Sequence, residues 1–284
     1  MNGPTESPAA AAREGDLIIE AGRADAHYWR DLWAYRDLLG LLTSRDIKVR
    51  YKETYLGVSW ALIQSIVTNI VFTFVFGKLA GMSAGGVPYP LLVLAGQLPW
   101  QFFCAALSGS SASLISNSNL ISKVYFPRLI IPLSSIGVAT VEFLLVLVLY
   151  FGASIWFGRF PSWHWALLPL FIFVALTLAF GAGVWLTALT VRYRDFKYIV
   201  PFIIQVGFFI SPVGFSTGVV PHWRNLLDLN PMTGVIDAFR WCLLSDGQPF
   251  DFQGISCSIA ISALLALSGL WYFRKMERTM ADII

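Results

Sequence analysis

Residues 129–157 read LIIPLSSIGVATVEFLLVLVLYFGASIWF, with one charged side chain, Glu142, in 29 residues. A helix needs roughly 20 mostly apolar residues to cross the hydrocarbon core of a bilayer. This stretch therefore predicts a membrane-spanning helix. Transmembrane β-strands are shorter and alternate apolar with polar residues, so the continuous apolar run argues against a barrel strand.

Five further stretches share this pattern and contain no Lys, Arg, Asp or Glu. They are residues 57–76, 89–107, 163–191, 198–220 and 255–273. Apolar residues make up 56% of the chain and charged residues 13%, against roughly 45–50% and about 25% in soluble domains. The sequence therefore predicts an all-α integral membrane protein with six transmembrane helices.

Basic residues are divided unevenly between the two sides of these predicted spans. All but four of the 20 Lys and Arg residues lie on one side, the exceptions being Lys78, Arg159, Arg224 and Arg240. Basic residues concentrate in cytoplasmic loops, so both termini are predicted to be cytoplasmic. The net charge of +3 follows from this topology. We expect membrane lipid, and not nucleic acid, as a partner.

The segment before the first span divides into two parts. Residues 1–28 are rich in Ala, Gly, Pro and acidic residues and lack the apolar core of a cleavable signal peptide. We expect them to form a flexible cytoplasmic tail. Residues 29–56 are predicted to form an amphipathic helix at the cytoplasmic interface, ahead of a six-helix transmembrane domain over 57–284. Residues 47–52 also alternate as a strand would, but a lone strand would have no partner here.

The predicted interface helix carries charges of both signs, at Arg45, Asp46, Lys48 and Lys52. A pure lipid anchor needs no acidic residue, so the mixture favours docking of a soluble partner over simple membrane anchoring. Two later polar segments lie on the same side of the predicted spans. They supply the remaining candidate contact residues, which are Asn117, Asn119, Arg192, Arg194 and Asp195.

Both later segments have a simpler alternative. In residues 110–128 the apolar side chains of Leu114, Ile115, Leu120 and Ile121 predict a short amphipathic helix in a polar loop, ended by Pro127. An ordinary turn is the alternative to a helix that presses on a partner. The turn 192–197, RYRDFK, either docks the partner or only fixes the topology through its basic residues.

Three motifs resemble those of a known family. They are RYKETYLGVSW at 50–60, KVYFPR at 123–128 and NPM at 230–232. Across residues 30–280 the chain is similar to the membrane subunits of ABC-type polysaccharide exporters, which move O-antigens, capsules and teichoic acids. It departs from many relatives at Gln64, where they carry a proline, which puts a kink there in doubt.

The resemblance implies a half-transporter in the bacterial inner membrane. Two copies would form a homodimer that passes a lipid-linked polysaccharide, with two copies of a separate cytoplasmic ATPase beneath it. A phosphate-binding loop needs the pattern GxxxxGK[ST], and the one Gly-Lys pair, Gly77-Lys78, is followed by Leu79. The chain is therefore expected to be non-catalytic, with ATP and Mg bound by the partner subunit.

No cofactor or metal site is expected in the chain itself. The histidines are too scattered to form a cluster, and the cysteines show no ligand spacing and fall in or near spans. These residues are His27, His164 and His222, and Cys104, Cys242 and Cys257. We expect the cysteines to be packing residues.

Glu142 lies about 20 Å into the third predicted span, at 1.5 Å per residue. A carboxylate at that depth should face the bundle or a cavity. It is either a proton-relay group or a structural residue that is protonated or hydrogen-bonded to a neighbour. No Lys, Arg or His accompanies it within the spans near that depth, so the structural role is favoured. Asn69 and Gln97 are explained by hydrogen bonds between helices.

Aromatic residues make up 15% of the chain. Flat sugar faces stack on such rings without a fixed register, so a polysaccharide path would favour an aromatic lining. The candidates are Tyr51, Tyr55, Trp60, Tyr125 and Phe126 at the cytoplasmic mouth, with Phe208 and Phe209 deeper. The alternative is the interfacial belt of Trp and Tyr found in many membrane proteins.

Residues 211–254 are too long for a simple loop. Two short helices, 223–229 and 233–244, are predicted around Asn230-Pro231, and neither is long enough to cross. They predict a re-entrant pair, with Asn230, Pro231 and Met232 at an outer gate or in a cap that completes the bundle. The acids Asp228, Asp237, Asp246 and Asp251 are expected to be solvated.

Three classes of function compete. The favoured one is the membrane subunit of an ATP-driven polysaccharide exporter, with lipid or drug as the alternative cargo. An ion-gradient-driven secondary transporter would favour inverted repeats and a titratable cluster at mid-membrane, and neither is evident. A membrane enzyme such as a glycosyl- or acyltransferase would need acids or histidines clustered at one interface.

Overall fold

The computed structural model describes residues 24–52, 59–82, 85–160, 162–219, 223–244 and 250–277. Within these ranges every regular element is helical and no strand occurs. Five helices are long and apolar enough to cross a membrane, namely Ser59–Leu79, Tyr89–Ser116, Ile130–Trp156, Trp163–Arg192 and Phe252–Glu277. The prediction of an all-α, multi-pass membrane protein is confirmed.

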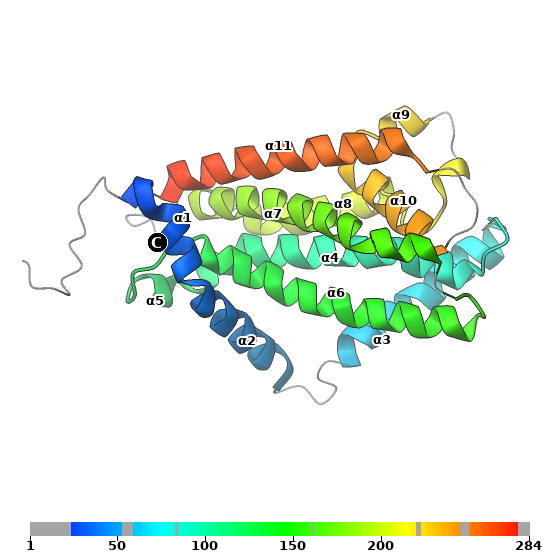
Figure 1. Cartoon of the computed structure of the whole chain (residues 1–284), viewed down its shortest axis with the longest axis horizontal. Helices are drawn as coiled ribbons and strands as arrows, with labels where there is room; N and C mark the ends of the chain where they lie inside the picture. Colours follow the sequence, from blue (N-terminus) through cyan, green and yellow to red (C-terminus); the bar gives the residue numbers. More distant parts are fainter. Residues whose placement is uncertain are drawn as a thin grey trace, which may run out of the picture.

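The helices, in chain order, are α1 (Ala24–Ala34), α2 (Arg36–Lys52), α3 (Ser59–Phe72) with its π-helical continuation η2 (Thr73–Leu79), α4 (Tyr89–Ser116), α5 (Ser118–Ile121), α6 (Ile130–Trp156), the 3₁₀ turn η3 (Trp163–Leu167), α7 (Leu168–Arg192), α8 (Phe196–Ile210), the 3₁₀ turn η4 (Thr217–Val219), α9 (Arg224–Leu227), α10 (Pro231–Leu244) and α11 (Phe252–Glu277). Figure 1 shows α4, α6, α7 and α11 side by side along the long axis of the molecule. Most of α4 is buried by its neighbours, whereas almost no residue of α3 with η2 is fully buried.

Two glycines let α7 and α11 approach closely. A Cβ atom added to Gly181 would lie 2.5 Å from the backbone nitrogen of Ala266, and one added to Gly269 would lie 2.7 Å from the carbonyl oxygen of Gly181. Helix pairs in membranes gain stability from such close packing of small residues, because lipid gives no hydrophobic drive between helices. The pair α7–α11 is therefore a tightly fixed part of the bundle.

The serine-rich stretch after residue 107 is helical, so the predicted loop starting at Ser110 is wrong. Helix α4 continues through Ser116, and its serine hydroxyls are satisfied by carbonyls of the preceding turn instead of by water. Ser110 Oγ donates to Ala106 O at 2.6 Å and Ser113 Oγ to Ser110 O at 2.6 Å. Both serines are buried, as is Leu114. The predicted short amphipathic helix is thus divided between the end of α4 and the single-turn α5.

The fifth predicted span, 198–220, is interrupted. Helix α8 ends at Ile210 and the chain turns at Ser211 and Pro212. Its 15 residues cover about 22 Å at 1.5 Å per residue, less than the roughly 30 Å of a bilayer core. Two helices follow, as predicted, but α9 is only a single turn. Helix α10 packs inside the bundle against α4, α7 and α11.

The segment before the first span forms two helices, α1 and α2, which meet at Tyr35. Residues 45–52 are helical, not extended. Tyr28 of α1 is buried beneath the guanidinium of Arg274, 4.0 Å from its ring centroid. The backbone N–H of Arg128 donates to Glu277 Oε1 at 2.9 Å. These contacts join α1, the start of α6 and the end of α11 at one end of the bundle. Residues 1–23, 53–58 and 278–284 lie outside the described residues.

We predict that Gly181→Ala destabilises the protein by about 1–3 kcal/mol, because the new methyl group meets the backbone of α11 and the two helices must separate. Gly152→Ala is the matched control, since nothing lies within 4 Å of its added Cβ atom. The measurement is the free energy of unfolding in detergent micelles. Equal stability of the two variants would contradict the close packing of α7 on α11.

Candidate functional site

A groove of about 430 Å³ lies between α3, α4, α6 and α8. Its polar side chains come from three of these helices, and its aromatic rings from α4, α6 and α8. The polar lining residues are Gln64, Thr68, Gln97, Gln101, Ser108 and Glu142, and the aromatic ones are Trp100, Phe102, Phe143 and Phe208. A cavity with amides and hydroxyls between aromatic rings, at the depth of the membrane-spanning helices, is the strongest candidate for a ligand path.

Gln97 is the most constrained polar group of the groove. Its side chain is 2% exposed, and its Nε2 donates to the carbonyl oxygen of Ser65 at 3.3 Å. The Oε1 atom has no hydrogen-bond partner among the described residues. Ser65 donates in turn to Gln101 Oε1 at 2.8 Å. The predicted hydrogen bond of Gln97 between helices exists, but it leaves one buried acceptor open.

Sequence reasoning missed Thr68, Gln101 and Ser108 of this polar wall. Gln97 and Gln101 are one turn apart on α4, and Gln64 and Thr68 are one turn apart on α3. Polar residues that recur at a spacing of four on apolar spans mark one face of each helix. This spacing could have predicted the polar faces of α3 and α4 from the sequence.

The rings of Trp100 and Phe208 form the aromatic part of the wall. Their centroids are 5.9 Å apart, and Phe72 packs edge-on against Phe208 at 5.2 Å. Phe208 therefore lines the groove, and its role in a polysaccharide path stays a prediction. Phe209 is 76% exposed and is not among the lining residues.

Three other predicted path residues, Trp60, Tyr125 and Phe126, are not among the residues that line the groove. Trp60 and Tyr125 are exposed, on the first turn of α3 and after α5. Phe126 is buried in a hydrophobic core with Leu129 and Ile130. Tyr55 lies outside the described residues.

Glu142 lines the groove and is held by two residues of α2. Arg50 forms an ion pair with its Oε1, and the Tyr51 hydroxyl donates to the same oxygen at 2.5 Å. Burial raises the pKa of Tyr51 to about 12, and the hydrogen bond and the charge of Glu142 add to the rise. The phenol thus stays protonated and able to donate. The predicted spans offer no cation to pair with Glu142. Arg50 of α2 supplies it, because that helix packs across α6.

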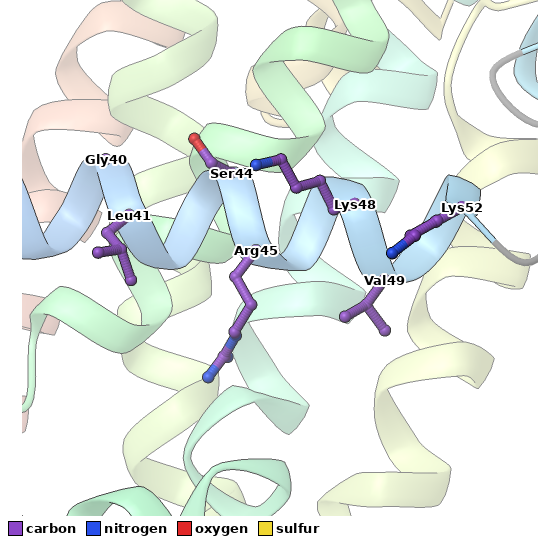
Figure 2. A pocket seen from close by; sticks show the side chains of 7 residues that line it. All are labelled: Gly40, Leu41, Ser44, Arg45, Lys48, Val49 and Lys52. Carbon is purple, nitrogen blue, oxygen red and sulfur yellow. The ribbon is translucent and has the colours of Figure 1, made fainter.

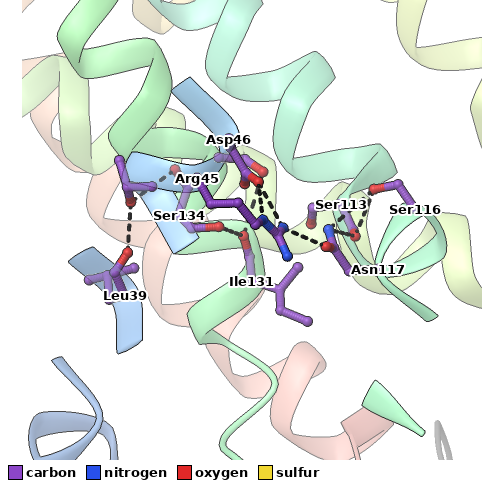
Figure 3. Close-up of polar contacts among 10 residues, drawn as sticks. Leu39, Arg45, Asp46, Ser113, Ser116, Asn117, Ile131 and Ser134 are labelled. Atoms are coloured by element: carbon purple, nitrogen blue, oxygen red, sulfur yellow. Dashed lines mark hydrogen bonds and ion pairs between the residues drawn. The ribbon is translucent and has the colours of Figure 1, made fainter. Parts of the chain in front are cut away.

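Three predicted contact residues meet at the junction of α2 and α4 (Figure 3). Arg45 Nη2 donates to Asp46 Oδ1 at 2.7 Å and to Asn117 Oδ1 at 2.8 Å. The amide of Asn117 donates to the carbonyl of Ser113 in the last turn of α4. The structure therefore ties α2 to the end of α4 through one charge-assisted network.

A shallow groove follows one side of α2, and its lining residues recur every four positions (Figure 2). They are Gly40, Leu41, Ser44, Arg45, Lys48, Val49 and Lys52. Lys48 and Lys52 are exposed, and the apolar Leu41 and Val49 beside them are exposed as well. This surface places two exposed basic side chains beside two exposed apolar ones.

The remaining predicted contact residues are exposed at the same end of the bundle as α1 (Figure 1). Asn119 lies on α5, and Arg194 and Asp195 lie in the turn between α7 and α8. Arg192 ends α7, where its guanidinium lies 5.3 Å from the ring centroid of Tyr193.

At the opposite end, Arg240 of α10 holds the interrupted segment after α8. Its guanidinium is buried and donates to Phe215 O at 2.7 Å, Val213 O at 2.8 Å and Leu92 O at 3.4 Å. The Thr217 hydroxyl donates to Oδ2 of Asp237 at 2.8 Å. Asp237 lies one turn before Arg240 on α10. The sequence placed Arg240 among the outer loop charges, and its buried role was missed.

Asn230 joins the end of α8 to the start of α10. Its amide donates to Ser211 Oγ at 2.9 Å, and its Oδ1 accepts from the backbone N–H of Met232 at 3.0 Å. Pro231 takes the first helical position, where its missing N–H has no cost. The predicted gate motif is therefore a helix cap that also binds the interrupted segment.

The expectation that the outer acids are solvated is wrong for those described. Asp228 is buried, Asp237 is mostly buried beside Arg240, and Asp251 pairs with Arg224 at 2.7 Å. Burial raises the pKa of Asp228, and the neighbouring Asp251 adds to the rise. Asp246 lies outside the described residues.

Comparison with known proteins gives a consistent result. Residues 37–244 match the family described as ABC-2 type transporter. The chain is 27% identical to the O-antigen export system permease protein RfbA of Myxococcus xanthus, covering 90% of this chain and 98% of that protein. It is 26% identical to RfbA of Klebsiella pneumoniae, covering 87% and 95%. The polysialic acid transport protein KpsM of Escherichia coli is 22% identical, covering 83% and 92%.

We predict that Arg240→Met lowers the free energy of unfolding by at least about 3 kcal/mol, because the buried carbonyls of the interrupted segment lose their donor. Arg159→Met is the matched control: Arg159 donates to one carbonyl, that of Gly86, at 2.9 Å in an exposed hydrogen bond. That variant should stay within about 1 kcal/mol of the parent. Unfolding in detergent micelles measures both variants. Similar losses of stability in the two would contradict the role of Arg240 in holding the interrupted segment.

Proposed function

The chain belongs to the ABC-2 type transporter family, and on that premise we propose that it is the membrane subunit of an ATP-driven exporter of lipid-linked, O-antigen-like polysaccharide. Relatives that cover most of the chain are named for O-antigen export and polysialic acid transport. The observation that carries the proposal is the groove in which amides and hydroxyls lie beside Trp100 and Phe208. Sugars present both hydroxyls and flat C–H faces, and this lining complements both.

The working unit in this proposal is a homodimer in the bacterial inner membrane, with both termini cytoplasmic. One copy would supply only one wall of a path, since almost no residue of α3 and its continuation is fully buried. A second copy would close the groove from that side. Two separate ATPase subunits would bind ATP and Mg and supply the energy, so this chain is not catalytic by itself.

The proposal retains six crossings. Helix α8 is too short to cross alone, and the turn at 211–217 would complete its passage. Helices α9 and α10 then form the re-entrant pair, and Asn230, Pro231 and Met232 lie at its outer gate. The division into a tail, an interface segment and a transmembrane domain over 57–284 is kept, but the interface segment begins with α1 at Ala24 and not at residue 29, because Tyr28 is buried beneath Arg274.

Helix α2 is the proposed link between the ATPase and the path. Its basic side offers Lys48 and Lys52 to the partner, and Arg45 ties it to Asn117. Its last turn holds Glu142, which lines the groove. A displacement of α2 by the ATPase would therefore act directly on the groove wall. Asp46, Asn119, Arg192, Arg194 and Asp195 would complete the contact surface.

The aromatic residues near the cytoplasmic side have a matching role in this proposal. Tyr51, Trp60 and Tyr125 would meet the glycan or its lipid-linked head group as it approaches the path. Aromatic faces bind sugar rings without a fixed register, which permits release as well as capture. Phe208 continues this surface inside the groove.

An ion-gradient mechanism receives no support from the groove. Glu142 is the one charged residue among its described lining residues, and it is paired with Arg50. A proton relay would need a second titratable group within reach. Export of another cargo, such as lipid or drug, is the alternative. Measurement of surface polysaccharide in a deletion strain distinguishes it from polysaccharide export.

We predict that deletion of the chain abolishes surface polysaccharide and that export returns only when the chain and its ATPase are both expressed. Labelling of surface glycan on intact cells measures this. The purified chain alone should hydrolyse no ATP, because it has no phosphate-binding loop. Normal surface glycan in the deletion strain would refute polysaccharide export, and would leave lipid or drug as the cargo to test.

We predict that Lys48→Glu/Lys52→Glu lowers export at least about tenfold, because charge reversal makes the docking surface repel its former partner. Insertion should persist, since many other cytoplasmic basic residues still set the topology. Arg30→Glu/Lys275→Glu is the matched control, with two exposed residues away from this surface. Surface glycan and co-purification of the ATPase are the measurements. Normal export by the Lys48/Lys52 variant would reduce α2 to a membrane anchor.

A further inference from the structure

Within the proposed function, we propose that Gly207 is a positioning residue of the path: it seats Trp100 of α4, which in turn holds the ring of Phe208 as the aromatic surface of the groove. This role rests on the proposed function of the groove as the polysaccharide path. Gly207 itself would not touch the sugar, and its effect would pass through the two neighbouring rings.

Phe208 is the aromatic residue of the groove that is best placed to meet a ligand. It lines the groove and keeps part of its surface exposed. The other aromatic lining residues are nearly covered, at 6%, 4% and 5% exposure for Trp100, Phe102 and Phe143. Trp100 therefore serves mainly as a support behind Phe208, and little of its own face is open to a sugar.

Two rings from other helices hold Phe208. Phe72 of α3 meets it edge-on, with ring centroids 5.2 Å apart and ring planes at 90°. The centroid of the Trp100 ring lies 5.9 Å away, with the two planes at 54°. Edge-to-face and tilted pairs at such distances are favourable, so the two contacts fix the orientation of the Phe208 ring.

The missing side chain of Gly207 gives Trp100 its place. A Cβ atom added to Gly207 would lie 3.1 Å from Cη2 of Trp100, which is closer than two carbon atoms normally pack. Gly207 lies inside α8, where glycine weakens a helix relative to alanine. Close approach of the indole edge to the backbone of α8 is a physical reason for glycine at this position.

A side chain at position 207 would enter the space that the edge of the indole occupies. Either the indole must turn away from α8, or α8 must move away from α4. Both movements take support from Phe208. A ring that is no longer held offers a sugar a less defined face, and binding then costs the entropy of ordering that ring.

The test measures surface glycan on intact cells, divided by the amount of chain in the membrane, so that a loss of stability is not counted as a loss of export. Phe208→Leu should lower export at least about tenfold, because leucine keeps apolar volume but lacks the flat face. Phe173→Leu is the matched control and should export like the parent. Phe173 is 67% exposed on α7 and is not among the lining residues.

Single changes at position 207 should show a graded effect. Gly207→Ala requires only a small shift of the indole and should lower export about three- to fivefold, whereas Gly207→Val should lower it at least about tenfold. Gly152→Val is the matched control, since nothing lies within 4 Å of a Cβ atom added to Gly152. It should leave export within about twofold of the parent.

Two double variants separate positioning from a general effect on packing. If Gly207 acts through Phe208, Gly207→Ala should lower export by less than about twofold when Phe208→Leu is already present, because both changes remove the same interaction. The phenyl ring in Trp100→Phe is shorter than the indole and makes room for a side chain at 207. Gly207→Val/Trp100→Phe should therefore export within about twofold of Trp100→Phe alone.

Full multiplication of the losses in Gly207→Ala/Phe208→Leu, no recovery in Gly207→Val/Trp100→Phe, or normal export by Phe208→Leu or Gly207→Val would overturn the positioning role. If Gly207→Val does not reach the membrane, the double variant with alanine decides. The deletion experiment separates this role from the proposed function. If export depends on the chain but these variants export normally, only the positioning role fails. If export does not depend on the chain, the proposed function fails and the positioning role fails with it.

Discussion

A bilayer offers no hydrogen-bond partner to the backbone, so the point at which α8 stops short must be satisfied from within the protein. Arg240 meets this requirement by donating to the carbonyls of Val213, Phe215 and Leu92. Its charge is tolerated there because Asp237 lies 3.9 Å away on the same helix. The interrupted segment and the buried position of α10 thus depend on each other.

The contacts of Arg240 also help to fix the wall of the candidate groove. Phe208 lies three residues before the turn at Ser211, and its ring packs against Trp100 of α4. Asn230 binds Ser211 from the start of α10, so the end of α8 is held from two directions. The groove wall is therefore anchored at its outer end by α10, although no residue of α10 lines the groove.

Much of this architecture followed from the sequence because the bilayer imposes simple rules on length and polarity. Four of the five long helices lie within four residues of the predicted bounds, α4 extends further, and α10 was expected as a short non-crossing helix. The errors concern polar groups that the protein satisfies internally. Serines 110 and 113 bond to their own helix, and Arg240 and Asp228 are buried. Hydropathy predicts such residues to be exposed to solvent, because it contains no information about the groups that they bond to in the fold.

The residues of the groove also differ in how well the sequence predicts them. Glu142 was expected to be structural, yet its partners on α2 were not foreseeable, since Arg50 and Glu142 are far apart in sequence and meet only because α2 packs across α6. The polar face of α4 is encoded locally, in the spacing of Gln97 and Gln101. Glu142 belongs to both the groove and the contact with α2, so the charge at the groove wall depends on the position of Arg50 and Tyr51. Helix α2 and the groove between the spanning helices are therefore electrostatically coupled.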